Sequence, residues 1–146
     1  MWKYQSNGSD ISLHDKVIDK IIVDGRNVKF IFEDGFDVYF PNSNSVGITT
    51  KSQLVLENFI FINCELSPTT TLQQSFYEEI KTIEPLLAFD GIEVLSLDFQ
   101  HSKNQYLLKG KTVFNYKKEG EAFLIMAFSC EKLIYCWDDY SEKYTI

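Results

Sequence analysis

The sequence SLHDKVIDKIIVDGRNVKFIFEDGFDVYF, from Ser12 to Phe40, decides the fold class of this chain. It holds three runs rich in β-branched and aromatic residues, which pack well on the surface of a sheet. The runs are separated by Asp24-Gly25 and Asp34-Gly35, and Asp-Gly is a strong signal for a hairpin turn. The stretch therefore predicts a three-stranded antiparallel meander, with strands at 17–23, 28–33 and 36–40.

The first of these runs can be interpreted in two ways. Leu13, Val17 and Ile21 lie four residues apart, a spacing that suits a helix. However, the run VIDKIIV is mostly β-branched, which restricts side-chain rotamers in a helix, and it ends in an Asp-Gly turn. We predict a strand.

Large apolar residues fall on both faces of the predicted meander. A two-residue turn between the second and third strands would pair Ile31 with Val38 on one face, while Phe30 would point to the other. A strand covered on both sides is typical of two packed sheets or of a sheet that closes on itself. We therefore predict a mainly β domain, an antiparallel β-sandwich or an incomplete barrel.

One segment has the periodicity of an amphipathic helix. Apolar residues recur at helical spacing between Thr71 and Glu84, at positions 72, 76, 80 and 83. Thr71 begins a capping-box pattern, although Ser67-Pro68 would start the helix a turn earlier. Pro85 would end it, because the residue before a proline avoids helical backbone angles. We predict one helix that covers a face or an end of the sheets.

Further strand signals occur on both sides of this helix. Residues 53–66 predict one long strand or two short ones broken near Glu57-Asn58, and the polar segments 42–52 and 138–146 predict a loop and a frayed tail. Later strands are expected at 92–100, 105–109, 112–117, 121–130 and 133–137. The last two should form a hairpin around Glu131-Lys132, in which Cys130 and Cys136 are not cross-strand partners and form no disulfide.

Size and charge predict a single acidic globular domain. The 146 residues match the common size of one domain, and the formal net charge is −7. A nucleic-acid or anionic-membrane partner is disfavoured, because phosphate groups are held mainly by Lys and Arg and the chain has one arginine, Arg26. The charge favours a basic protein partner, or it serves solubility alone.

The cysteines and the N-terminal sequence predict a cytoplasmic protein. Cys64, Cys130 and Cys136 are odd in number and lack paired spacing, so they are expected to be free thiols. The first residues do not resemble a secretory signal, and no apolar run approaches the roughly 18 residues of a membrane helix. The seven glycines form no phosphate-binding loop, and the Cys and His residues lack zinc spacing, so no cofactor or metal is expected.

The sequence contains few motifs that are typical of a catalytic site. His14-Asp15 is the one suggestive pair, but adjacent residues of a strand point to opposite faces, so Asp15 would not orient His14. The nucleophile motifs of hydrolases are absent from the sequence. With 21 Asp and Glu residues, a pair of catalytic carboxylates stays open as a minor alternative.

The densest acidic and aromatic cluster is Trp137, Asp138, Asp139 and Tyr140. Trp and Tyr are frequent anchors of protein interfaces, so this cluster is a candidate docking rim for a basic partner, and Arg26 and the 42–52 segment are the other candidate contacts. The alternative interpretation is an ordinary turn at the end of a hairpin.

Two loose patterns resemble a known group of proteins. They are Ser12-Leu13-His14-Asp15 followed by VKFIFEDGF, and the late segment from Phe123 to Asp138 that contains SC and YCWD. In outline they resemble small uncharacterised bacterial β-rich proteins, some of which accompany polymorphic toxins as immunity proteins. The resemblance carries no catalytic residues and implies a partner-binding role.

These observations predict a non-catalytic cytoplasmic binding protein, an inhibitor of a toxin in the immunity-protein sense. The alternatives are a sandwich or barrel that encloses a small apolar ligand and, ranked last, a carboxylate-based hydrolase. Unpaired edge strands would also allow a homodimer.

Overall fold

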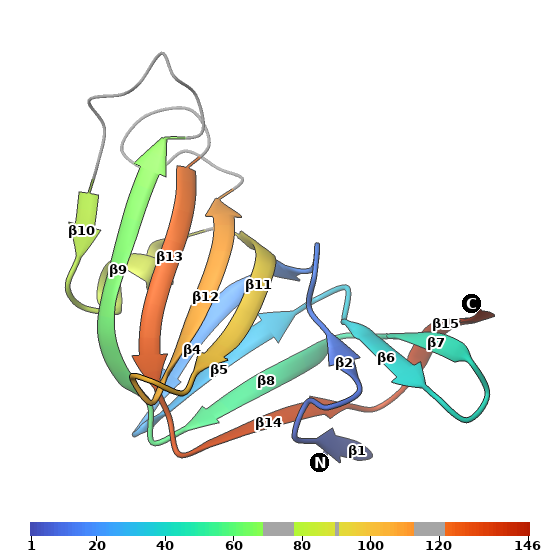
Figure 1. Cartoon of the computed structure of the whole chain (residues 1–146). Helices are drawn as coiled ribbons and strands as arrows, with labels where there is room; N and C mark the ends of the chain where they lie inside the picture. The colour runs from blue at the N-terminus through green and yellow to red at the C-terminus, as the bar shows by residue number, and fades with distance from the viewer. Residues whose placement is uncertain (69–77, 90, 113–121) are drawn as a thin grey trace.

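The computed structural model describes residues 1–68, 78–89, 91–112 and 122–146, which form three antiparallel sheets (Figure 1). The five-stranded sheet contains, in spatial order, β1 (Tyr4–Ser6), β14 (Lys132–Trp137), β8 (Ser52–Glu57), β5 (Asn27–Phe32) and β4 (Lys20–Asp24). The six-stranded sheet contains β10 (Glu78–Ile80), β9 (Ile60–Pro68), β13 (Ala122–Ser129), β12 (Gln105–Thr112), β11 (Ile92–Gln100) and β3 (Val17–Ile18). The four-stranded sheet contains β15 (Tyr140–Thr145), β7 (Ser45–Thr49), β6 (Asp37–Phe40) and β2 (Ile11–Ser12).

One long antiparallel ribbon joins the three sheets. Residues 45–68 pair with residues 122–145, from Ser45 opposite Thr145 to Pro68 opposite Ala122. The ribbon comprises β7 with β15, then β8 with β14, then β9 with β13, and it bends sharply between each pair (Figure 1). We call it the bent ribbon.

Backbone hydrogen bonds continue across both bends of the ribbon. At the bend between β8 and β9, the Glu131 N–H donates to the Glu57 carbonyl at 2.8 Å. At the bend between β7 and β8, the Thr50 N–H donates to the Asp139 carbonyl at 3.0 Å. The two strands therefore turn together and keep their register from one sheet to the next.

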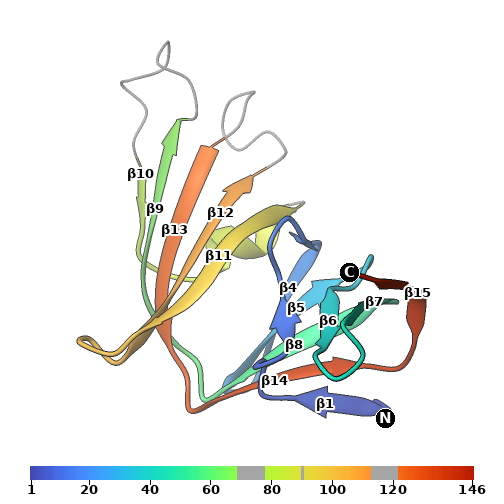
Figure 2. The ribbon, with the colours of Figure 1, turned by 45° about the vertical axis from the view of Figure 1, so that its right-hand side comes forward.

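The core fills the angle between the five-stranded and six-stranded sheets (Figure 2). Phe30 of β5 meets Phe128 of β13 edge-to-face, with ring centroids 6.5 Å apart, and both side chains are completely buried. Fully burying a side chain of this size stabilises the fold by about 1.5–3 kcal/mol. Other buried side chains in this cluster are Leu54, Leu56, Leu66, Val94, Leu108, Leu124 and Met126.

The predicted fold class is confirmed: the described residues are mainly β, and their three open antiparallel sheets pack as a sandwich, without closing into a barrel. The first Asp-Gly hairpin is also confirmed. Strands β4 and β5 are joined there, with Asp24 opposite Asn27 and Gly25 at a φ of 63°. The predicted break near Glu57-Asn58 is where β8 passes into β9.

The prediction for the second Asp-Gly pair was wrong. Strand β5 pairs with β4 and β8, whereas β6 belongs to the four-stranded sheet, so Ile31 does not face Val38. Gly35 has a φ of 73° and lies against the backbone of Thr49, in the bend between β7 and β8. The turn therefore carries the chain from one sheet to another and does not fold it back on the same strand.

The predicted last hairpin was wrong for the same reason. Strands β13 and β14 lie in different sheets, since the chain passes through the bend of the ribbon at Cys130-Glu131. Cys136 lies opposite Gln53 of β8 and Gln5 of β1. All three cysteines are free, as expected.

The helix prediction fails where the structure can be compared with it. Residues 71–77 lie outside the described residues, but Glu78–Ile80 forms strand β10 on the edge of β9. Among the described residues the one helical element is a 3-10 turn, η2 (Glu84–Ala88), and Pro85 lies in its first turn. No helix in the described part of the chain has the length and apolar character to cross a membrane.

Three segments predicted to be irregular are paired strands. Within the predicted 42–52 loop, residues 45–49 form β7, and the tail predicted to fray forms β15. Strand β12 continues through Gly110-Lys111, where a turn was expected, and residues 113–117 lie outside the described part. β7 and β15 pair with each other across the length of the chain, whereas β12 pairs with β11 and β13, its neighbours in sequence.

Candidate functional site: an aromatic groove beside the bend at Asp138

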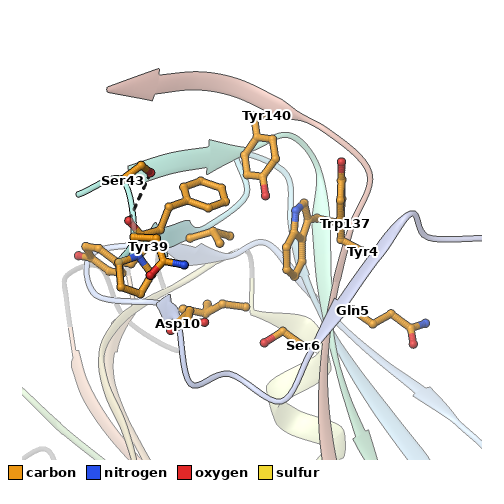
Figure 3. A pocket seen from close by; sticks show the side chains of 13 residues that line it. Tyr4, Gln5, Ser6, Asp10, Tyr39, Ser43, Trp137 and Tyr140 are labelled. Carbon is orange, nitrogen blue, oxygen red and sulfur yellow. Dashed lines mark hydrogen bonds between the residues drawn. The ribbon is translucent and has the colours of Figure 1, made fainter. Parts of the chain in front are cut away.

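A groove of about 500 Å³ opens where β1, the turn between β6 and β7, and the bend between β14 and β15 meet (Figure 3). Its floor and walls include Tyr4, Ile11, Val38, Phe40, Trp137 and Tyr140. Asp10, Asn42 and Ser43 add polar groups at its margin. The groove is therefore an aromatic and apolar depression with a polar rim.

Strand pairing places the aromatic side chains of the groove side by side. Tyr4 lies opposite Trp137 in the β1–β14 pair, and the two rings stack with centroids 5.5 Å apart and planes 21° apart. The Tyr140 ring lies 6.0 Å from Tyr4 and 5.7 Å from Phe40. Trp137 is 5% exposed, whereas Tyr4 is 44% exposed, so Tyr4 is the accessible end of the stack.

Two polar groups next to this stack, the indole N–H of Trp137 and the hydroxyl of Tyr140, can form further hydrogen bonds. The Nε1–H of Trp137 is buried, and no acceptor among the described residues meets hydrogen-bond geometry. The Tyr140 hydroxyl points toward the indole (Figure 3). Burial raises the pKa of Tyr140, and the weaker contact with the Trp137 N–H partly opposes this shift. The hydroxyl therefore stays neutral near pH 7 and can itself donate a hydrogen bond.

The acidic rim is formed by Asp138 and Asp139, which are both exposed at the bend between β14 and β15. Asp138 Oδ1 accepts the backbone N–H of Lys3 at 2.7 Å, and Asp139 Oδ1 accepts that of Tyr140 at 2.8 Å. These bonds fix the carboxylates beside the aromatic stack. Neither carboxylate forms an ion pair with a described Lys, Arg or His side chain.

Lys143 of the chain itself packs against two aromatic rings of the groove. The Lys143 ammonium lies 4.6 Å from the centroid of the Tyr140 ring and 5.4 Å from that of Phe40. Such cation–π contacts are attractive because the face of an aromatic ring is electron-rich. The Tyr140 and Phe40 rings therefore already contact a cation from within the chain.

Comparisons with known proteins give no family. No family profile, curated protein or solved structure matches the chain.

The structure brings together four of the five candidate interface residues and separates the fifth. Trp137, Asp138, Asp139 and Tyr140 are consecutive at one end of β14. Arg26 lies in the β4–β5 turn, where its carbonyl accepts the Phe59 N–H beside the start of β14 at Lys132. Arg26 is therefore at the opposite end of the five-stranded sheet from Trp137.

Sequence reasoning missed Tyr4 and Phe40 as parts of this site. Tyr4 lies in a short segment near the N-terminus, and Phe40 ends a strand that was assigned to a different neighbour. No local signal pairs β1 with β14, which lie more than 125 residues apart in sequence. The predicted 42–52 segment does contribute, through Asn42 and Ser43.

The geometry of His14 and Asp15 differs from the prediction. The chain turns at Asp15, which has a φ of 63°, and His14 Nε2 lies 3.4 Å from Asp15 Oδ2. The argument from strand alternation is therefore wrong here. His14 Nδ1 lies 3.0 Å from the Leu95 carbonyl, and both side chains are about two-thirds exposed. Within the described residues no Ser, Thr or Cys side chain is hydrogen-bonded to the imidazole.

The cysteines do not resemble reactive or metal-binding groups. Burial raises the pKa of Cys64 to about 12 and that of Cys130 to about 11, so both are neutral thiols near pH 7. No cluster of three or more His, Cys, Asp or Glu side chains suited to a metal occurs in the described ranges.

Proposed function

We propose that this protein is a non-catalytic binding protein that recognises a basic protein partner through the aromatic groove and its acidic rim. The role of an immunity-type inhibitor, which neutralises a toxin by covering a basic surface, fits this proposal. The observation that carries it is the Tyr4 ring, exposed on top of the buried Trp137, beside the carboxylates of Asp138 and Asp139, which form no ion pair with a described side chain.

Both parts of the site favour cationic side chains. An Arg or Lys of the partner would stack on the open face of Tyr4, as Lys143 stacks on Tyr140, and would reach the carboxylates beside it. Aromatic residues supply a large contact area at low entropic cost, while the net charge of −7 would steer a basic partner toward the surface.

A titration followed by NMR tests the proposal directly. The chain has two tryptophans, so Trp137 gives one of two indole N–H signals, and the amide of Arg26, at the opposite end of the five-stranded sheet, supplies an internal reference. With a short Arg-rich peptide at low salt, we expect the Trp137 indole signal and the amide signals of Asp138–Tyr140 to shift. The shifts should shrink strongly at about 0.5 M salt, where the Debye length is only a few ångströms.

Charge-matched variants test whether binding depends on the carboxylates of this site or only on the net negative charge of the protein. Asp138→Asn/Asp139→Asn removes two carboxylates at the rim, and Glu79→Gln/Glu84→Gln removes two exposed carboxylates on and beyond β10. We expect the first variant to bind the peptide about tenfold more weakly and the second to bind as the unmodified protein does. Equal losses in both, or equal shifts with a Glu-rich peptide, would contradict the proposal.

The inhibitor role needs a second experiment, since peptide binding alone does not establish it. If the product of a neighbouring gene is a basic toxin, co-expression should protect cells from it. Tyr4→Ala/Asp138→Asn should lose that protection while folding normally, and the Glu79→Gln/Glu84→Gln variant should keep it. Full protection by the Tyr4 variant would exclude the groove as the inhibitory surface.

A small apolar ligand is the second candidate occupant of the groove. Its volume of about 500 Å³ lies within the range of small-molecule sites, and Ile11, Val38 and Phe40 supply apolar walls. Titration with an apolar fluorescent probe distinguishes the two functions. Saturable binding that displaces the Arg-rich peptide and is insensitive to salt would favour the small ligand.

A further inference from the structure

The unpaired edges of the sheets differ in length and in apolar character. Strands β1, β2, β3 and β10 have two or three residues each, and short edge strands are a common protection against unwanted pairing. Strand β15 has six residues but is polar, with the sequence YSEKYT. Strand β4 is the exception, because its sequence KIIVD places three β-branched residues on the edge of the five-stranded sheet.

The outer side of β4 has no partner among the described residues. β4 pairs on one side with β5, and no further backbone or side-chain hydrogen bond of residues 20–24 occurs with other described elements. Ile22 and Val23 are 39% and 46% exposed. The short helix η2 lies near β4, and its Leu86 is buried in the core.

The register of the hairpin determines which backbone groups point outward. Asp24 and Asn27 close a two-residue turn, so the N–H and C=O groups of Asp24, Ile22 and Lys20 face β5. The groups of the alternate residues, Ile21 and Val23, therefore face away from the sheet. They are the groups that an added strand would bond.

This edge is complementary to a second copy of itself. If two β4 strands pair antiparallel about Ile22, Ile21 of one copy faces Val23 of the other, and their outward N–H and C=O groups match. In the same register Lys20 faces Asp24 of the second copy at both ends, and Ile22 faces Ile22 at the centre. Both of these are non-hydrogen-bonded pairs, in which opposite side chains come closest.

We propose that the protein forms a symmetric dimer through antiparallel pairing of β4 with β4 of a second copy. The pairing joins the two five-stranded sheets into one continuous sheet across a twofold axis at Ile22. It is held by four backbone hydrogen bonds, by the apolar contact of Ile21, Ile22 and Val23, and by Lys20 of each copy, which would join the existing Lys29–Asp24 ion pair of the other copy. Because the edge is only five residues long, the dimer is weak and depends on protein concentration.

Hydrogen exchange of the unmodified protein gives the first test. Raising the protein concentration from about 20 μM to about 1 mM should slow exchange of the Ile21 and Val23 amides by about three- to sevenfold, the range that mass action allows for a dimer. The Ile22 amide faces β5 and should be unaffected, so it serves as the control in the same sample. Exchange of all three amides that is independent of concentration would overturn the proposal.

Charge reversal gives the second test. K20D places two carboxylates at each end of the pairing and D24K places two ammonium groups there, so each variant should sediment as a monomer at about 1 mM. A mixture of the two variants restores attraction at both ends and should form the heterodimer. The K20D/D24K double variant should self-associate as the unmodified protein does. Dimers that persist in both single variants, or a mixture that stays monomeric while both variants are folded by circular dichroism, would exclude this edge.

Discussion

Gly35 and Thr49 meet where the chain crosses between the five-stranded and four-stranded sheets. Thr49 is 1% exposed, and its hydroxyl oxygen accepts the Phe36 N–H at 2.9 Å and lies 2.7 Å from the hydroxyl of Ser52. Gly35 has a φ of 73°, and a Cβ atom there would collide with the Thr49 backbone. A side chain at position 35 is therefore excluded both by backbone conformation and by space.

Gly35→Ala is expected to lower the free energy of unfolding by about 2–4 kcal/mol, because overpacking adds to the strain of a positive φ. Gly25→Ala is the matched control: Gly25 also has a positive φ, of 63°, but a Cβ atom there meets nothing within 4 Å. Its cost should be only about 1 kcal/mol, from backbone strain alone. Urea denaturation measures both, and equal losses would show that the contact with Thr49 is unimportant.

Cys64 is completely buried, and burial raises the pKa of its thiol from 9.0 to about 12. The unfolded chain therefore loses this proton at a lower pH than the folded protein does. Below pH 9 both states keep this proton, and the free energy of unfolding does not depend on it. As the pH rises from 9 toward 12, ionisation of Cys64 in the unfolded chain lowers the free energy of unfolding by at most about 1.4 kcal/mol per pH unit. Urea denaturation at pH 8, 9 and 10 should show a steeper decline for the unmodified protein than for Cys64→Ala. Parallel declines would exclude Cys64 as the cause.

At the scale of elements, the bend between β8 and β9 depends on Asn58. This residue has a φ of 52°, a conformation that Asn tolerates well and β-branched residues do not. Its side-chain amide donates to the Glu131 carboxylate on the other strand of the bent ribbon. Asn58 thus sets the backbone angle of one strand and holds the second strand beside it.

Asn58→Val is expected to destabilise the protein by about 2–3 kcal/mol, since it combines strain at a positive φ with loss of the amide contact. Asn58→Gly keeps the backbone conformation and removes only the side chain, so its cost should be about 1 kcal/mol or less. Thermal denaturation of the two variants separates the contributions. A Gly variant as unstable as the Val variant would assign the whole effect to the Glu131 contact.

The two Asp-Gly pairs show that local sequence predicts a turn but does not predict which strands pair. Both give the same local turn signal, and both glycines adopt a positive φ. At Asp24-Gly25 the following strand pairs with the preceding one, whereas after Asp34-Gly35 the strand pairs with β7 and β2. The turn residues predict the turn, but the partner of the next strand is decided by residues far away in the sequence.

At the scale of the whole molecule, the same limit explains which features of the candidate site were predictable. The composition of Trp137-Asp138-Asp139-Tyr140 identified one side of the groove, because those residues are consecutive. Tyr4 and Phe40 complete it from strands whose pairing has no sequence signal. The mainly β fold was predictable from residue types, while the division into three sheets depends on the bends of the ribbon.

The bent ribbon also has a consequence for how the chain reaches its native state. Its paired residues are separated by 54 positions at one end and by 100 at the other, as the pairs Pro68–Ala122 and Ser45–Thr145 show. Forming the first pair of the ribbon therefore costs the entropy of closing a long loop, and contacts of neighbouring pairs offset that cost only afterwards. We expect a slow folding reaction, in milliseconds to seconds, with a transition state in which both halves of the chain have already met. The bent ribbon that joins the three sheets would then also determine the rate at which they form.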